Sequence, residues 1–384
     1  MSDSRIVICG GGIAAVEGLL RLRKLLGDSA SIELIAPNEK LVYRPMAVKQ
    51  PFAAGPPKRY PLKRITADCG AEWRQDSLAW VDRDRQVVHT GEGQSVEFDE
   101  LLVAVGARQI EPFKHVRTFS DADADATYQG ALQDIEGGYS GSIAFILPVG
   151  PVWPLPIYEL ALMTAERARS MGIDELEITL VTPETRPLAI FGQTASEAVS
   201  KRLDEAGVSV YASALAQVPA ARQLLVQPQG VELHPERMIA MPRVEGPTIR
   251  GLAGGGAHGF IPIDQSCCVP GTSSRIYAAG DAAAYPIKHG GLGAQMADTA
   301  ATAMARLAGA EVDHKPFWPV IRGMLLTGAD PLYISARLVG TLGFESEVYD
   351  TPPWPADEKV VAEELGPYLA SFDSGHSPSG AAAQ

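Results

Sequence analysis

A single acidic residue, Asp281, stands where the sequence can bring several binding groups together. It follows an apolar run predicted as a strand over 276–279, and Gly280 before it lets two backbones approach closely. An alanine-rich helix is predicted next, with Gly291 and Gly293 at its start, so its free N–H groups and positive dipole end face the same place. A carboxylate accepts hydrogen bonds from a polyol, and a helix N-terminus stabilises an anion. A reduced flavin carries both groups, a ribityl chain and a negatively charged pyrimidine edge.

A glycine-rich turn near the N-terminus has the residue types that bind a dinucleotide. A short buried strand is predicted over 5–9, followed by GGGIAAVEG and an amphipathic helix to about residue 26. Gly10, Gly12 and Ala15 fill the three small-residue positions of the dinucleotide fingerprint, which serve a tight turn, contact with a pyrophosphate and helix–strand packing. The alternative is a tight turn that binds nothing.

The second strand of this unit lacks the acid that usually binds a ribose. That strand is predicted over 31–37, and the fingerprint places the acid near its end. Ala36 occupies the position, so the ribose must be held by Asn38, Glu39 or backbone groups.

A third motif, DELLVAVGAR at 99–108, is a buried strand that ends in a glycine turn before Arg108. In order and spacing over about residues 5–310, the three motifs resemble the FAD-dependent pyridine nucleotide–disulfide oxidoreductase superfamily. The resemblance implies that the first motif holds the FAD pyrophosphate and that Asp281 holds the ribityl chain. It also implies that Gly106, Ala107 and Arg108 mark the crossing between an FAD domain and a central domain.

Three further segments resemble one branch of that superfamily, which contains sulfide:quinone oxidoreductase, flavocytochrome sulfide dehydrogenase and type II NADH dehydrogenase. These segments are PIKHGG at 286–291, LVYRPMAV at 41–48 and HGFIPID at 258–264. In the branch, the loop resembling 41–48 lies against the flavin, and in flavocytochrome relatives a cysteine there tethers it. This loop has Tyr43, Arg44, Pro45 and Met46 instead, so FAD is expected to bind noncovalently.

The motifs and the resemblance together give a set of residues expected to contact FAD, with the Leu78 backbone proposed for the adenine. The set is Gly10, Gly11, Gly12, Ile13, Ala14, Ala15, Ala36, Pro37, Asn38, Arg44, Pro45, Leu78, Ala104, Val105, Gly106, Arg108, Gly280, Asp281, Lys288, Gly291 and Leu292. No residue is marked by the sequence as a general base or nucleophile. Lys288, His289 and Trp153 are candidates; a surface lysine and a loop histidine are the alternatives for the first two.

The central region predicts a second dinucleotide-like unit whose turn is altered. Helices are predicted over 158–171 and 194–206, and strands over 176–182 and 208–211, at the spacing of βαβ units. The first turn has several prolines, and of the fingerprint glycines only Gly150 remains. Proline has no backbone N–H, which argues against ordinary nicotinamide binding.

The expected fold class is α/β, with two Rossmann-like domains, the second inserted in the first, and a small C-terminal cap. The cap is expected to contain two strands and an acidic helix ending near residue 370, and to cover the flavin or pair two subunits. The expected divisions are an FAD-binding domain at 1–115 and 245–313, a central NAD(P)-binding-like domain at 116–244, the cap at 314–370 and a disordered tail at 371–384.

Composition and net charge limit the classes of partner that the protein is expected to bind. The formal net charge of −13 over 384 residues argues against nucleic acid and against an anionic membrane surface. No run of about 18 apolar residues predicts a transmembrane segment. The four cysteines do not suggest a secreted disulfide framework, so a cytoplasmic setting is expected. Small-molecule electron donor and acceptor are the expected partners, no metal site is expected, and a homodimer is left open.

The leading hypothesis is an FAD-dependent oxidoreductase that passes two electrons from an unassigned donor, NAD(P)H or a small reductant, to a quinone or small-molecule acceptor. One rival is a sulfide:quinone-type enzyme. Trp153 and Pro154 occupy the region where that branch has a reactive cysteine, which leaves Cys267 and Cys268 as its only candidate thiols. The other rival is a non-enzymatic flavin-binding protein with a redox-sensing or partner-binding role.

Overall fold

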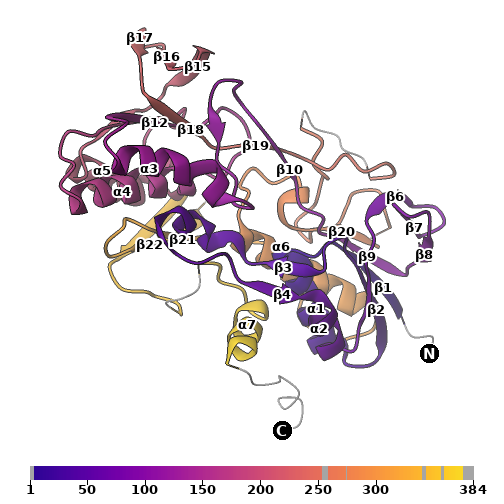
Figure 1. Cartoon of the computed structure of the whole chain (residues 1–384). Helices are drawn as coiled ribbons and strands as arrows, with labels where there is room; N and C mark the ends of the chain where they lie inside the picture. The colour runs from indigo at the N-terminus through magenta and orange to yellow at the C-terminus, as the bar shows by residue number, and fades with distance from the viewer. Residues whose placement is uncertain (1–3, 253–257, 274, 340–342, 356–358, 375–384) are drawn as a thin grey trace.

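The computed structural model describes residues 4–252, 258–273, 275–339, 343–355 and 359–374. Its elements form two lobes, and each lobe is built around a parallel sheet (Figure 1). The five-stranded sheet of the first lobe has the order β20-β9-β1-β2-β5, with every pair parallel. Its strands are β1 (Ser4–Cys9), β2 (Ala30–Ile35), β5 (Glu72–Arg74), β9 (Glu100–Val103) and β20 (Ile276–Ala278).

Strands β1 and β9, and β20 at the edge of the sheet, are largely buried on both faces, which explains why they appear in the sequence as continuous apolar runs. Two helices pack against each other over the sheet, α1 (Ile13–Leu26) and α6 (Gly290–Leu307). The buried face of α6 consists largely of alanine and glycine, so the helix axis lies close to its neighbours. Gly18 of α1 leaves room for the Leu102 side chain beneath it.

The second lobe repeats the parallel architecture, with the strand order β11-β18-β12-β13-β14. The predicted helices and strands of this region are confirmed to within a few residues. The elements are β11 (Arg117–Thr118), β12 (Ser142–Ile146), β13 (Glu177–Val181), β14 (Val208–Tyr211), β18 (Arg237–Ala240), α3 (Gly130–Glu136), α4 (Leu155–Ser170) and α5 (Gln193–Glu205). Before α3 the chain forms a π-helical turn, η2 (Asp125–Gln129), which runs on into that helix.

Smaller antiparallel elements complete both lobes. The sheet β15-β16-β17 projects from the central lobe (Figure 1). The antiparallel strands of the two lobes are β3 (Lys40–Val42) with β4 (Arg59–Pro61), β6 (Leu78–Asp82) with β7 (Val87–Thr90) and β8 (Ser95–Glu97), β10 (Arg108–Ile110) with β19 (Arg243–Glu245), and β15 (Leu215–Ala220) with β16 (Gln223–Gln227) and β17 (Val231–Leu233). Short helices lie between the strands: η1 (Arg44–Phe52), α2 (Leu62–Asp68), η3 (Ala189–Phe191) and η4 (Gly280–Ala282).

The C-terminal region forms a three-stranded antiparallel sheet and a helix. The strands are β21 (Val320–Leu325), β22 (Leu332–Val339) and β23 (Gly343–Tyr349), so the region has one strand more than the sequence predicted. The predicted helix is α7 (Leu365–Asp373), which begins after the acidic residues that were expected within it. The Glu17 carboxylate of α1 accepts hydrogen bonds from the Glu364 and Leu365 N–H groups, at 3.1 and 2.6 Å, and so caps α7. Most of the predicted disordered tail, 375–384, lies outside the described residues.

A buried ion pair joins the C-terminal region to the central lobe. Lys359 Nζ donates to Glu159 Oε2 at 2.6 Å, and the Leu326 N–H donates to Glu159 Oε1 at 3.0 Å. Both side chains are almost fully buried, so burial raises the pKa of Glu159 and lowers the pKa of Lys359. None of the helices in the described ranges is both long and apolar enough to span a bilayer.

Lys359→Met is expected to lower the free energy of unfolding by about 3–5 kcal/mol, because it leaves the Glu159 carboxylate buried without its counter-charge. Urea denaturation followed by circular dichroism measures the loss. The double variant Lys359→Met with Glu159→Gln keeps an acceptor for the Leu326 N–H and removes the charge, so it should recover part of the stability. A single variant as stable as the wild type would show that the pair does not hold the two regions together.

Candidate functional site

The three sequence motifs meet at one edge of the first sheet. β1, β9 and β20 are neighbours and parallel, so the turns that follow them lie together at their carboxyl ends. A Cβ at Gly10 would lie 2.2 Å from the Ala104 carbonyl oxygen, and one at Gly280 would lie 3.2 Å from the Ala14 Cβ. The strand order reverses between β1 and β9, which is where open α/β sheets bind ligands.

The first turn offers unused hydrogen-bond donors. Gly10 has φ of +132° and donates its N–H to the Ile35 carbonyl, which fixes the turn. Gly12 is the N-cap of α1, no side chain caps the helix, and the space where a Cβ would stand is open to 4 Å. The N–H groups of Ile13, Ala14 and Ala15 therefore face an open space with no intrahelical acceptor. This arrangement suits an anionic diphosphate.

Asp281 presents a carboxylate without a donor. No described residue donates a hydrogen bond to it, and burial raises its pKa, with the nearby Asp121 charge adding to the shift. The start of α6 lies next to it, because a Cβ at Gly293 would come within 3.0 Å of the Gly280 Cα. The side chain thus has free acceptor oxygens beside an uncapped helix N-terminus. A polyol with hydroxyl donors would satisfy it.

Lys288 supports the turn that carries Asp281. Its Nζ donates to the Asp281 and Ala283 carbonyl oxygens at 3.2 and 2.6 Å and stands 3.5 Å from the centre of the Phe260 ring. Burial lowers the pKa of Lys288 to about 8, against the opposing effect of the Asp281 charge. The two hydrogen bonds of Lys288 therefore stabilise the turn at 281–283, and its positive charge can also act on a cofactor.

The other two catalytic candidates lie in contact, although they are far apart in sequence. The rings of Trp153 and His289 are 4.5 Å apart at an angle of 39°, and Phe191 packs on the other side of Trp153. Burial, together with the charge of Lys359, lowers the pKa of His289 to about 3. His289 is therefore neutral at physiological pH and has no imidazolium proton to give. Its Nδ1 is buried without a partner among the described residues.

Sequence reasoning predicted Arg44 and the loop that contains Tyr43, but it missed their partners Asp121 and Val360. The Tyr43 hydroxyl accepts a hydrogen bond from the Val360 N–H at 3.3 Å, and Val360 packs against Gly290 at the start of α6. Arg44 lies 3.6 Å from Asp121, whose charge acts on Asp281. These contacts join segments far apart in the chain, so the sequence carries no short-range signal for them.

Many of the remaining predicted cofactor residues lie at or beside the three turns, and the others lie after β2, on η1, or on β6 and β10. Ala36 is fully buried after β2, while Pro37 and Asn38 after it are exposed. Leu78 begins β6, and the Arg108 guanidinium lies 3.4 Å from Glu245. The residues at the turns or helix starts are Gly11, Ile13, Ala14, Ala15, Ala104, Val105, Gly106, Gly291 and Leu292, with Arg44 and Pro45 at the start of η1.

The thiols are not placed for nucleophilic chemistry. All four cysteines are free and buried, and Cys267 has φ of +60° in a turn before β20. Burial raises the pKa of Cys267 far above its ordinary value, so its thiolate does not form at physiological pH. Burial of Cys267 and Cys268 fits a packing role for both side chains.

Comparisons with known proteins bear on the family. Residues 4–137 match the family model described as pyridine nucleotide-disulphide oxidoreductase. Residues 4–137, about a third of the chain, therefore form a domain of that family. A stretch of 122 residues is 30% identical to apoptosis-inducing factor 1 of Saccharomyces cerevisiae, covering 32% of each chain. A stretch of 310 residues is 25% identical to rhodocoxin reductase of Rhodococcus erythropolis, covering 73% of this chain and 65% of that one.

A solved structure extends the likeness of fold along most of the chain. The sulfide:quinone oxidoreductase of Aquifex aeolicus matches with a TM-score of 0.79 and 18% identity, over 90% of this chain and 87% of that one. The matched regions span less than two thirds of the length of the two curated relatives named above. The family expected from the motifs is confirmed for residues 4–137, and the sulfide:quinone oxidoreductase structure has a similar fold over most of the chain. FAD is the cofactor of this family, and the unused donors of α1 and the unpartnered Asp281 carboxylate fit it.

Two glycines of the first turn should separate folding from cofactor binding. Gly10→Ala is expected to destabilise the chain by about 2–4 kcal/mol, because a methyl group meets the Ala104 carbonyl and φ is strained. Gly12→Ala meets nothing in the protein and should leave the free energy of unfolding of the cofactor-free chain almost unchanged, while weakening FAD binding roughly tenfold. Urea denaturation and FAD titration measure the two effects. Equal stability of the two variants would contradict this account of the turn.

Asp298 of α6 should make stability fall with rising pH. It lies 4.0 Å from Arg21, and burial with the charges of Glu17 and Glu363 raises the pKa of Asp298 to about 8. In the unfolded chain an aspartate ionises near pH 4, so between those values the folded state binds the extra proton and is favoured at the lower pH. Neutral His289 has the opposite effect below about pH 6.5.

The Asp298 contribution is therefore clearest between about pH 6.5 and 8. Asp298→Asn should remove a slope of up to about 1.4 kcal/mol per pH unit in that window, measured as the difference from wild type in denaturation at several pH values. Asp330→Asn, at an exposed position, is the control. Parallel pH profiles for wild type and Asp298→Asn would show that the carboxyl ionises normally.

Proposed function

We propose that the chain is an FAD-dependent oxidoreductase that passes two electrons from a small-molecule donor to a quinone or small-molecule acceptor through noncovalently bound FAD. The observation that carries the proposal is the Asp281 carboxylate, held without a donor beside the uncapped start of α6 at the meeting point of three turns. When bound, FAD supplies two-electron transfer between donor and acceptor.

Different residues bind different parts of FAD. The N–H groups at the start of α1 bind the diphosphate, and Asp281 accepts hydrogen bonds from the ribityl hydroxyls. The start of α6 stabilises negative charge at its N–H groups, and Lys288 keeps the Asp281 turn in place. This division assigns FAD binding to residues 1–115 and 245–313, with the cap at 314–370 covering the start of α6.

The buried pair of Lys359 and Glu159 gives the site a source of protons. Lys359 Nζ donates a hydrogen bond to Glu159 at 2.6 Å. The Lys359 charge also adds to the effect of burial in lowering the pKa of His289, at the start of α6. A quinone takes up two protons with two electrons, so a proton donor near the electron path serves that class of acceptor. Trp153 and Phe191 cover this area with aromatic surface, which limits the access of water.

The relatives support the same reading. Rhodocoxin reductase is named as a reductase, and the matching Aquifex aeolicus structure is named as a sulfide:quinone oxidoreductase. Sulfide oxidation by the same chain is disfavoured, because Cys267 and Cys268 are buried and the pKa of Cys267 is raised. Small-molecule partners, a cytoplasmic setting and pairing into a homodimer belong to this proposal as well.

Asp281→Ala tests the proposal. It should lower the affinity for FAD by roughly 10- to 100-fold, because hydrogen bonds to a charged acceptor contribute about 1.5–3 kcal/mol. Asp281→Asn, which keeps one acceptor oxygen, should lose less, and Asp330→Ala is the control. Titration of FAD into the cofactor-free chain, with absorbance near 450 nm, gives the affinities. A colourless wild-type protein whose FAD affinity is unchanged by Asp281→Ala would end the proposal, whereas bound FAD with no turnover of any donor would leave the non-enzymatic reading.

A further inference from the structure

The two parallel lobes share a topology but differ in the turn after their first strand. In the first lobe only residues 10–12 separate β1 from α1, whereas residues 147–154 separate β12 from α4. Pro148, Pro151 and Pro154 fall in this longer turn and have no N–H to give. The turn is also used by the protein itself, since the Val244 N–H of β19 donates to the Pro151 carbonyl at 3.0 Å.

The start of α4 offers little to a phosphate. Pro156 at its second position has no N–H, and the Ile157 N–H already donates to the Pro154 carbonyl at 3.2 Å. Of the first three helical positions, only Leu155 keeps a free N–H. At α1 the same three positions are all free, so the diphosphate-binding capacity of one lobe is almost absent from the other.

The ribose-binding position of the central lobe is also altered. β12 and β13 pair in register from Ser142 with Glu177 to Ile146 with Val181, so the residue just beyond the second strand is Thr182. Its side chain is fully buried. The acid expected at the end of this strand is therefore missing, and the nearest carboxylate is Glu184.

The Glu184 carboxylate is already hydrogen-bonded within its own chain. The Tyr158 hydroxyl of α4 donates to Glu184 Oε2 at 2.5 Å, and the Thr182 hydroxyl donates to the same oxygen at 3.3 Å. Burial raises the pKa of Glu184, and the hydroxyls of Tyr158 and Thr182, with the nearby Leu188 and Ala189 N–H groups, oppose that shift. Tyr158 is fully buried and Glu184 is partly buried, so the contact ties the carboxylate to the core and occupies its Oε2 oxygen.

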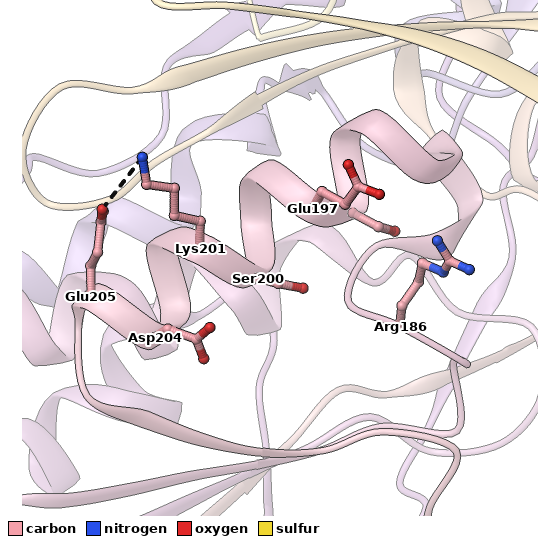
Figure 2. A pocket seen from close by; sticks show the side chains of 7 residues that line it. Arg186, Glu197, Ser200, Lys201, Asp204 and Glu205 are labelled. Atoms are coloured by element: carbon pink, nitrogen blue, oxygen red, sulfur yellow. Dashed lines mark ion pairs between the residues drawn. The ribbon is translucent and has the colours of Figure 1, made fainter.

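The nearest open surface does not replace the lost site. A hollow of about 460 Å³ lies along α5, lined by Arg186, Glu197, Ser200, Lys201, Asp204 and Glu205 (Figure 2). Lys201 is already 3.8 Å from Glu205, and the acidic residues outnumber the basic ones. Arg186 faces Glu197 across the hollow (Figure 2). Phosphates need excess positive charge, which this surface does not have.

We propose that the proline turn, Thr182 and the Tyr158–Glu184 hydrogen bond make the central lobe unable to bind a nicotinamide dinucleotide, so that the donor is a small reductant without an adenosine diphosphate group. This inference rests on the proposed function and narrows the class of electron donor. In the first lobe Ala36 also replaces an acid, but the free N–H groups of α1 remain there, with Asn38 and Glu39 exposed beside them. The central lobe lacks both means of binding.

Anaerobic stopped-flow mixing tests the inference on the FAD-loaded full chain, with NADH and NADPH each at about 1 mM, the upper end of ordinary KM values. The expected result is no loss of absorbance near 450 nm beyond the buffer control within a minute. Dithionite in the same cell should bleach the flavin fully. A flavin that dithionite does not reduce, or a chain that holds no flavin, counts against the proposed function instead.

Titration of NAD⁺ and ADP-ribose by calorimetry provides a second measurement that does not depend on electron transfer. No heat of binding is expected for wild type or for Glu184→Gln. Saturable bleaching by NADH or NADPH, or saturable binding of ADP-ribose, would overturn the inference. If Glu184 held a ribose after all, Glu184→Gln would also weaken that binding roughly tenfold or more.

Discussion

The close approach of backbone segments at the carboxyl ends of β1, β9 and β20 is the constraint on which the site depends. A Cβ at Gly10 would lie 2.2 Å from the Ala104 carbonyl oxygen, which the fold does not permit, and a Cβ at Gly280, where φ is +72°, would be crowded against Ala14. The approach brings the free N–H groups of α1 and the Asp281 carboxylate to one place. Without it, each motif would be an isolated turn, and neither the diphosphate nor the polyol would find its partners together.

The same parallel architecture occurs twice in the chain, but the turn after the first strand differs between the two lobes. In the first lobe the turn is short, rich in glycine and open. In the central lobe it is long, rich in proline and hydrogen-bonded to β19 through the Pro151 carbonyl. Parallel topology therefore sets where a ligand can bind, and the chemistry of a few turn residues decides whether one does.

Sequence reasoning predicted the parts of the site that are encoded locally. The glycine turn, the strand before Asp281 and the alternating strands and helices of the central lobe each carry a short-range signal of periodicity or turn chemistry. The contact of Trp153 with His289 and the pairing of Lys359 with Glu159 carry none, because they join segments far apart in the chain. β23 was missed although its residues alternate between exposed and half-buried, since the polar GFESEVY has little apolar contrast to show that period.

The C-terminal segment completes the site, and buried polar and charged contacts attach it in addition to apolar side chains such as Leu365 and Leu369. Glu17 caps α7, Lys359 reaches into the central lobe, and Val360 lies on the start of α6 under the Tyr43 hydroxyl. Burial disfavours the charged form of each of these ionisable groups, so each attachment is stable only while its partner is present. Because the two lobes and α6 supply those partners, the segment can dock only when all three are in place. The cover over the start of α6 is therefore coupled to the assembly of the whole site, which a purely apolar contact would not require.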